Sequence, residues 1–241
     1  ALTSDETRLV VVNREANSLS IIQVKDEHGH DVAIKLDEIA VGQEPRCVAV
    51  HPTDQAAYVT NGITGTVSVV DLVQGREVQQ IPVGTEPRSC ALTPDGSRLY
   101  VANHTEGTIS ILGIPSDNPL TPRFHGSVHV GGNPTALAIT DTGGSLSDDR
   151  VFVTQLFAER ASQLANDPFR GEARDRGKQG IVHVLRVATR NPPIAKITLS
   201  PLAHSGFTTD RSRFCPNLNL MVMGVPIHAH PAHRTTPIYC P

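Results

Sequence analysis

The sequence lacks the features that mark several large classes of protein. Its 241 residues contain no tryptophan, three tyrosines and six phenylalanines. Lysine and arginine number 21 against 24 acidic residues, so no excess of positive charge is present to neutralise the phosphates of a nucleic acid. Its apolar runs are far shorter than the roughly 20 residues that a helix needs to cross a bilayer. We therefore expect no nucleic-acid partner and no membrane span.

The sequence also lacks short motifs of familiar chemistry. It has no Gly-x-Ser-x-Gly elbow of a serine hydrolase, no His-Glu-x-x-His metal motif and no Cys-x-x-Cys-His haem attachment site. The first residues carry no signal-peptide pattern. The missing hydrolase, metal and haem motifs favour a protein without a cofactor and without catalysis of its own.

What the sequence does contain is an internal repeat of about the length that propellers and solenoids use. Three landmarks recur with the same offset of 42 residues. They are Val41–Arg46 with Val83–Arg88, Tyr58–Asn61 with Tyr100–Asn103, and Gly65–Val69 with Gly107–Ile111. A single offset for all three indicates one repeated structural unit.

Each unit reads as four short β-branched runs separated by turn residues. In the second copy the runs are Cys47–Val50, Ala57–Thr60, Val67–Asp71 and Glu77–Val83. Four antiparallel strands repeated at this length predict an all-β fold, a β-propeller built from four-stranded blades. Blades are expected near residues 7–41, 42–83, 84–130 and 131–200. About four to five blades are therefore present, and we expect them to form an incomplete ring relative to a seven-bladed propeller.

These motifs resemble the YVTN β-propeller repeat family, which is named for the tetrapeptide that stands here at Tyr58–Asn61. The resemblance covers residues 7–200. It implies a prokaryotic, exported binding module that works in the periplasm or outside the cell. The segments 151–158 and 201–208 look like those of propellers fused to a c-type cytochrome or dihaem peroxidase. That second resemblance implies a redox partner domain downstream.

The repeat also marks where the chain departs from it. We expect propeller blades over residues 1–204, with an insertion at 156–179, and an irregular tail rich in proline and histidine at 205–241. The insertion places 24 residues between Gln155 and Gly180, where three separate Asn103 from Gly107. Loops of this length inside a domain are often functional or disordered. The tail carries His228, His230, His233 and Cys240, and its composition favours a solvated tail over a zinc site.

Antiparallel strands connect at alternating ends, so the Gly-x-x-Pro-Arg loops, the Asn-x-x-x-Gly loops and the insertion are expected on one face. The candidate binding residues on that face are Arg46, Arg88, Asn61, Asn103, His104, Arg160 and Arg170. Two interpretations stay open for the arginines. They clamp a carboxylate or another anion, or they pair with the neighbouring Glu44 and Glu86 and brace the loops. The asparagines also have a structural interpretation, because Asn at a strand end satisfies turn backbone groups.

Two cysteines lie near equivalent places in neighbouring blades. Cys47 follows its Pro by two residues and Cys90 follows its own by three, so alternation along a strand directs the two side chains to opposite sides. The pattern predicts two separate small core residues without a bridge between them.

The sequence as a whole favours a non-catalytic binding or scaffold propeller. Its partner is expected to be a protein or a small anionic ligand. Two alternatives remain, namely the propeller module of a periplasmic c-type cytochrome or peroxidase assembly, and a lactonase-like hydrolase. Fold alone cannot choose among them.

Overall fold

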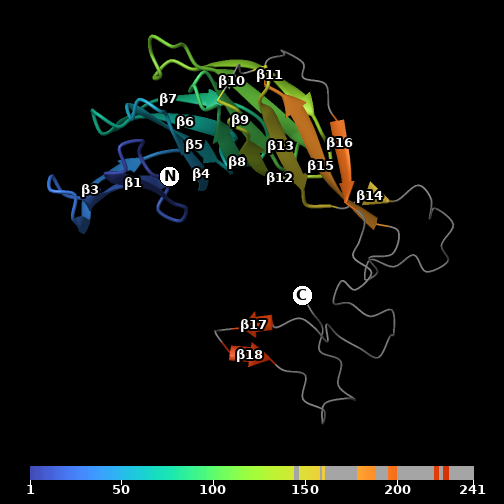
Figure 1. The fold of residues 1–241 in the computed structure, drawn as a ribbon, viewed down its shortest axis with the longest axis horizontal. Coiled ribbons are helices and arrows are strands. Elements are labelled where there is room, and N and C mark those ends of the chain that lie inside the picture. Colours follow the sequence, from blue (N-terminus) through green and yellow to red (C-terminus); the bar gives the residue numbers. More distant parts are fainter. Residues whose placement is uncertain are drawn as a thin grey trace. The chain divides into compact units, whose positions relative to one another are not determined.

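The computed structural model describes residues 1–143, 147–157, 159–160, 178–187, 195–199, 220–222 and 225–227. Every regular element in these ranges is a β-strand (Figure 1). The chain divides into two compact units. The first comprises Ala1–Phe157 and Ile181–Ile197, and the second comprises Ala158–Gly180 and Thr198–Pro241.

The first blade of the first unit is a three-stranded antiparallel sheet. It consists of β1 (Arg8–Asn13), β2 (Ser18–Lys25) and β3 (Asp31–Ala40), in that order. Residues Ala1–Thr3 run along the free side of β1, where Leu2 bridges Leu9 and the amide of Thr3 donates to the carbonyl of Arg8 over 2.9 Å. The amides of His51 and Thr93 make the equivalent bonds in the next two blades. Ala1–Thr3 thus lie where the end of a first strand lies in the other blades.

The second and third blades each have four antiparallel strands in chain order. The second is formed by β4 (Pro45–Val50), β5 (Ala56–Asn61), β6 (Thr66–Asp71) and β7 (Arg76–Pro82). The third is formed by β8 (Pro87–Leu92), β9 (Arg98–Asn103), β10 (Thr108–Gly113) and β11 (Arg123–His129). These bounds lie within a few residues of the predicted runs, so the predicted four-stranded blade is confirmed.

The fourth blade repeats this order with a longer third strand. Its strands are β12 (Pro134–Ile139), β13 (Arg150–Gln155), β15 (Lys178–Arg186) and β16 (Ala195–Leu199). Residues 182–186 of β15 pair with β13 in the first unit. The described residues therefore form about four blades, within the four to five that the repeat predicts.

The second unit contains two short pairings. Glu159–Arg160 form β14, which pairs with Lys178–Gln179 at the start of β15. Further along, β17 (Leu220–Val222) and β18 (Val225–Ile227) form a small antiparallel hairpin in which Met221 lies opposite Pro226. The remainder of the predicted tail at 205–241 lies outside the described residues, and so do His228, His230, His233 and Cys240.

The blades pack face to face, and an apolar layer lies between each pair. Alternate residues of one strand therefore enter two different layers. In β5, Ala57 and Val59 pack with the first blade, whereas Ala56 and Tyr58 pack with the third. Tyr100 and Ala102 of β9 repeat this arrangement toward the fourth blade. Because both faces of the middle strands are buried, these strands are apolar on both sides, which explains runs such as Tyr58–Val59.

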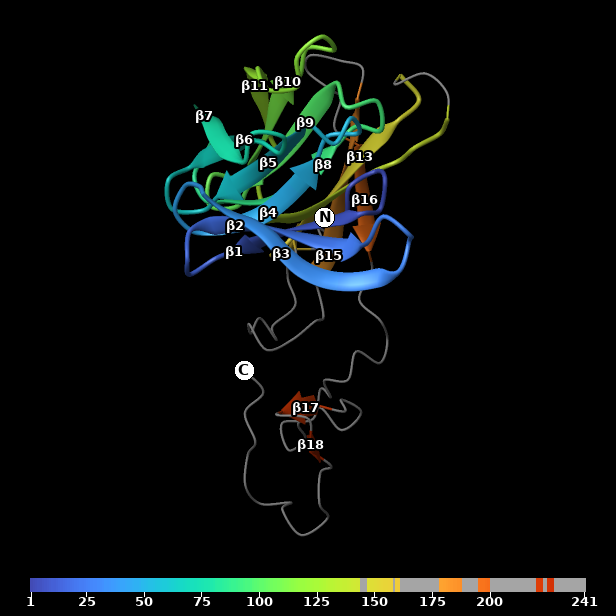
Figure 2. The ribbon, with the colours of Figure 1, turned by 90° about the vertical axis from the view of Figure 1, so that its left-hand side faces the viewer.

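We call β4, β8 and β12, the first strands of the second, third and fourth blades, the inner strands. Among them, β8 contacts both β4 and β12. Figures 1 and 2 show the blades of the first unit following one another in chain order, with β7 and β11 on the side away from the inner strands. Each inner strand begins with a proline and has an irregular register just after it. The predicted propeller class is therefore confirmed in the arrangement as well as in the strands.

Candidate functional site

Two sets of loops meet at one end of the blades, and we call this end the rim. One set precedes the inner strands, and the other joins the second and third strands of each blade. The amide of Gly62 donates to the carbonyl of Glu44 over 2.8 Å, and that of His104 donates to Glu86 over 2.9 Å. In the fourth blade the amide of Leu156 donates to Asn133 over 2.9 Å, so the insertion begins at the same end. The Gly-x-x-Pro-Arg loops and the Asn-x-x-x-Gly loops, which the sequence assigns to one face, therefore lie together.

Equivalent residues of the rim share an unusual backbone conformation. Glu44 and Glu86 both have φ of 57°, and Asn133 has φ of 55°. A non-glycine residue in this left-handed region is strained by about 1 kcal/mol or more. The proline that follows each of them starts an inner strand. The backbone therefore holds the two glutamate side chains in the same orientation in successive blades.

The glutamates of the rim join arginines from three blades into one chain of ion pairs, which we call the ion-pair ladder. Arg14 of the first blade donates to Glu44, with Nε at 2.9 Å from Oε1. Arg46 lies between two carboxylates, with Nη2 at 2.9 Å from Glu44 and 3.6 Å from Glu86. Arg88 completes the ladder at 2.6 Å from Glu86. The ladder thus crosses the interfaces between three successive blades.

The partners of both glutamates keep them ionised. A hydrogen bond from Arg14, and to a smaller extent one from Arg46, lowers the pKa of Glu44 below its ordinary value. A hydrogen bond from the hydroxyl of Thr105, and to a smaller extent one from the guanidinium of Arg88, lowers the pKa of Glu86. The carboxylates are therefore negative at neutral pH and balance part of the arginine charge.

The ladder is nevertheless asymmetric, because it contains three arginines and two glutamates. The fourth blade has Asn133 and Thr135 where the earlier blades have Glu and Arg, so it adds no charged member. Arg88 makes both of its hydrogen bonds, through Nε and Nη2, to one oxygen of Glu86. Its side chain is 30% exposed, and that of Arg14 at the other end is 54% exposed. Positive charge is therefore accessible at both ends of the ladder.

The predicted site residues Asn61, Asn103 and His104 are buried. Asn61 donates through Nδ2 to Thr66 at 3.0 Å and to Ser68 at 2.8 Å, which ties the second strand of its blade to the third. Asn103 makes the same pair of bonds in the next blade. In His104, Nδ1 lies 3.1 Å from the carbonyl of Pro134. Their positions favour a structural role, whereas Arg46 and Arg88 remain at the surface of the rim.

The two repeated motifs of the sequence touch each other at this place. A methyl group added at Gly42 would lie 2.6 Å from Cγ of Asn61, and one added at Gly84 would lie 2.5 Å from Cγ of Asn103. The glycine of each Val-Gly motif thus makes room for the amide at the end of each Tyr-Val-x-Asn motif. This contact explains why the two motifs recur together.

The side chains of two predicted site residues, Arg160 and Arg170, lie outside the described part of the chain. The backbone of Arg160 belongs to β14, but its side chain lies outside the described part of the chain. Arg170 and most of the insertion at 156–179 also lie outside it.

Sequence reasoning missed two members of the rim, Arg14 and Thr105. Arg14 directly follows Asn13, in the position that Gly62 and His104 occupy in the next blades. The repeat therefore places Arg14 at the rim, but nothing in the sequence indicates that it reaches across to the glutamate of the following blade. The same limit applies to Thr105, whose hydroxyl donates to Glu86.

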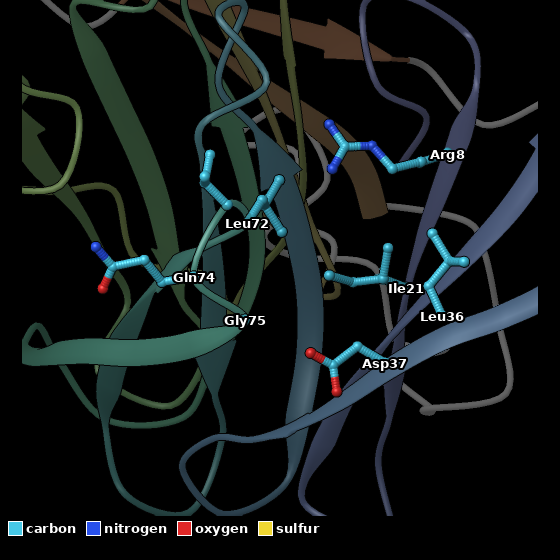
Figure 3. Close-up of a pocket in the computed structure, with 8 residues that line it drawn as sticks. Arg8, Ile21, Leu36, Asp37, Leu72, Gln74 and Gly75 are labelled. Carbon is cyan, nitrogen blue, oxygen red and sulfur yellow. The ribbon is translucent and has the colours of Figure 1, made fainter.

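Two open grooves lie between the first and second blades. One, of about 250 Å³, lies at the end opposite the rim and is lined by Arg8, Ile21, Leu36, Asp37 and the turn Leu72–Gly75 (Figure 3). The other, of about 390 Å³, lies at the rim beside Arg14, Glu44 and Ile63. The side chain of Ile63 is 69% exposed there. The rim groove thus combines an accessible arginine with an exposed apolar residue.

The cysteine pair corrects a prediction. The sulfur atoms of Cys47 and Cys90 lie 2.7 Å apart, whereas the sequence predicts that they point away from each other. They do point to opposite sides of equivalent strands, but β4 and β8 belong to facing sheets. A side chain directed toward the next blade therefore meets one directed back toward the previous blade.

Within the described residues, no three His, Cys, Asp or Glu side chains gather in a way that would hold a metal ion. Across the same residues, no helix has the length and apolar character to cross a membrane.

Face-to-face antiparallel blades about contacting inner strands define the β-propeller class of proteins. Comparison with protein families then identifies the particular domain. The model of the Choice-of-anchor I domain matches residues 1–133, more than half of the chain. The chain belongs to the choice-of-anchor I domain family. The finer resemblances to YVTN repeats and to cytochrome fusions stay predictions.

Solved structures with similar folds support the propeller class. A putative 6-phosphogluconolactonase from Bacteroides uniformis is 17% identical, with a TM-score of 0.61, over 83% of this chain and 54% of its own. One from Bacteroides fragilis is 19% identical, with a TM-score of 0.52, over 58% and 41%. The Swd1 β-propeller domain from Myceliophteria thermophila is 9% identical, with a TM-score of 0.55, over 82% and 56%. This chain thus spans about half of each protein. No curated protein matches it.

Proposed function

We propose that the chain is a non-catalytic binding module that holds an acidic partner protein at the rim. The observation that carries this proposal is the ion-pair ladder, which has one more arginine than glutamate and leaves Arg14 and Arg88 accessible at its two ends. A guanidinium group presents several donors in one plane and suits the paired oxygens of a carboxylate. Residues 1–204 form the propeller in this proposal, and the insertion at 156–179 extends its binding face.

The surroundings of the ladder favour a protein partner over a free small anion. The groove beside Arg14 is open, and Ile63 offers an apolar contact next to the charge. Protein interfaces combine a few apolar anchors with charged groups that orient the partner. The loops of the rim are held by strained but repeated backbone geometry, which keeps the charged groups in place before binding.

A binding assay with acidic peptides tests the proposal. The full chain is titrated into a fluorescent peptide of alternating glutamate and isoleucine, and a matched peptide has glutamine in place of glutamate. We expect binding of the acidic peptide alone, weakening as salt is added. Replacing Arg88→Ala or Arg14→Ala is expected to reduce the affinity about tenfold or more, as loss of a charged hydrogen bond does.

Arg76→Ala is the matched control, because Arg76 is an exposed arginine at the start of β7, at the opposite end of the blade. This variant is expected to bind like the unmodified chain. Equal binding by all the variants, or equal binding of both peptides, would show that the rim arginines do not carry recognition.

A second candidate function is hydrolysis of a lactone. Two of the similar structures with TM-scores above 0.5 are named as putative 6-phosphogluconolactonases. A phosphorylated lactone is an anion, so Arg88 would suit it as well. Hydrolysis of 6-phosphogluconolactone by the full chain, measured against the spontaneous rate, separates the candidates. Turnover that is lost in Arg88→Ala would favour the hydrolase, and the spontaneous rate alone would favour the binding module.

We also propose an extracellular or periplasmic location, which the anchor in the family description supports. The redox alternative, a cytochrome or peroxidase domain downstream, stays a prediction. A haem absorbance band in the protein purified from its native host would establish it.

A further inference from the structure

We infer that Cys47 and Cys90 form a reversible disulfide that joins the inner strands of two neighbouring blades. Their sulfur atoms lie 2.7 Å apart, so they need to approach by only about 0.65 Å to reach covalent length. The two residues come from β4 and β8, which contact each other along the inner side of the blades. This inference does not depend on the function proposed above.

The two cysteines lie close together because of the way in which neighbouring blades pack. The amide of Cys90 donates to the sulfur of Cys47 over 3.1 Å. At the next interface the amide of Leu137 donates to the hydroxyl of Ser89 over 3.3 Å. Ser89 is the counterpart of Cys47 and Leu137 is the counterpart of Cys90, each in the following blade. The same backbone relation therefore recurs, and of these two interfaces only the one between the second and third blades has a thiol on both sides.

Neighbouring residues confirm the directions of the side chains. Ala49, two residues after Cys47, packs into the apolar layer between the second and third blades. Cys90 and Leu92 enter that layer from the third blade. Val48 and Val50 face the first blade instead. Both cysteines thus face the same interface from opposite sides.

The two thiols differ in reactivity. The hydrogen bond from the Cys90 thiol and the nearby Cys90 amide lower the pKa of Cys47. The hydrogen bond to Cys47 and burial raise the pKa of Cys90. Since the thiolate is the nucleophile in disulfide exchange, Cys47 is expected to react first and Cys90 to resolve the product.

The oxidant in this proposal is a low-molecular-weight disulfide. The Cys47 thiolate attacks one of its sulfur atoms, a mixed disulfide forms, and one small thiolate leaves. Cys90 then loses its proton and attacks the sulfur of Cys47, which breaks the mixed disulfide and releases the second small thiolate. In total, two protein thiols lose two electrons and two protons, and one small disulfide becomes two thiols.

Mass spectrometry of the full chain tests the proposal, with oxidised glutathione as the probe. Cys215→Ser and Cys240→Ser are introduced first, so that only the pair remains. Oxidation of the native protein is expected to remove about 2 Da, the two thiol hydrogens. Trypsin is expected to yield residues 47–76 linked to residues 89–98, and a reductant should separate them.

Two variants use residues that this chain already has at the equivalent positions. Cys47→Ser copies Ser89, and Cys90→Val copies Val48. The Cys90→Val variant is expected to keep glutathione on Cys47, whereas Cys47→Ser is expected to stay unmodified. The inference is overturned if both cysteines of the oxidised native protein are still alkylated after unfolding, or if glutathione stays on Cys47 while Cys90 remains free.

Discussion

At the scale of single residues, the contact between Gly84 and Asn103 shows how the repeat is constrained. Asn103 is fully buried and held by bonds of 2.9 Å to Thr108 and 2.8 Å to Ser110. Its amide therefore cannot move aside to accept a larger neighbour. The backbone of Gly84 lies against that amide, and the same contact joins Gly42 and Asn61 in the blade before. Position 84 therefore requires glycine, because the Cβ atom of any other residue would overlap the fixed amide of Asn103.

We predict that Gly84→Ala lowers the free energy of unfolding by about 1 to 3 kcal/mol, as overpacking of a rigid site does. Urea denaturation measures the change. Gly180→Ala is the control, because a methyl group there would lie in ordinary contact, 3.5 Å from Leu199. In a chain that already carries Asn103→Ala, Gly84→Ala should lower the free energy of unfolding by less, because the overlapping amide has been removed. Equal stability of the two single glycine variants would contradict the prediction.

Three acidic residues predict how stability depends on pH, namely Glu44 and Glu86 at the rim and Asp5 at the opposite end of the first blade. The folded chain lowers the pKa of Glu44, Glu86 and Asp5, the last to about 2 through hydrogen bonds from Thr3 and Thr7. The unfolded chain therefore binds protons at a higher pH than the folded chain does. The stability that these groups supply is complete at neutral pH, and it is lost progressively as the pH falls below about 5 toward 2.

Urea midpoints measured between pH 7 and pH 3 test this prediction. We expect little change down to about pH 5 and a steady decrease below it. A variant with Glu44→Gln and Glu86→Gln should show a smaller decrease over the same range. A midpoint that stays constant to pH 3 in the unmodified chain would show that these carboxylates contribute no stability.

At the scale of elements, the inner strands explain why the sequence misplaced the two cysteines. Alternation along a strand correctly puts Cys47 and Cys90 on opposite sides. The error was to conclude from opposite sides that the two side chains lie apart. They belong to facing sheets, so residues on opposite sides share one interface. Strand patterns describe one sheet at a time and do not state which sheet faces which.

The link between β4 and β8 is expected to stabilise the fold. A disulfide between residues 43 positions apart restricts the unfolded chain and should add about 3 to 5 kcal/mol to the free energy of unfolding. Urea denaturation of the oxidised and reduced protein, each checked by mass, measures the difference. The chain with Cys47→Ser and Cys90→Val should not respond to the oxidant. Equal midpoints for the two redox states of the unmodified pair would contradict this prediction.

At the scale of the whole molecule, the sequence predicted the propeller class and its blades because the repeat carries both. One offset of 42 residues gives the blade length, and β-branched runs such as Val67–Asp71 give its strands. The face that holds the Pro-Arg loops follows from antiparallel connection alone. The ion-pair ladder could not be predicted as a unit, because its links from Arg14 to Glu44 and from Arg46 to Glu86 cross between blades. Such links depend on distances that no repeat pattern contains.

The central claim is that successive blades repeat one packing geometry, and cross-linking of the next interface tests it most directly. In a chain without its natural cysteines, Ser89→Cys and Leu137→Cys reproduce the Cys47 and Cys90 pair between the third and fourth blades. We predict that oxidised glutathione joins them in the native protein. A control with Ser89→Cys and Ala136→Cys should remain unlinked, because Ala136 is directed away from the third blade. Linking of the control pair, or failure of the first pair to link, would contradict the account.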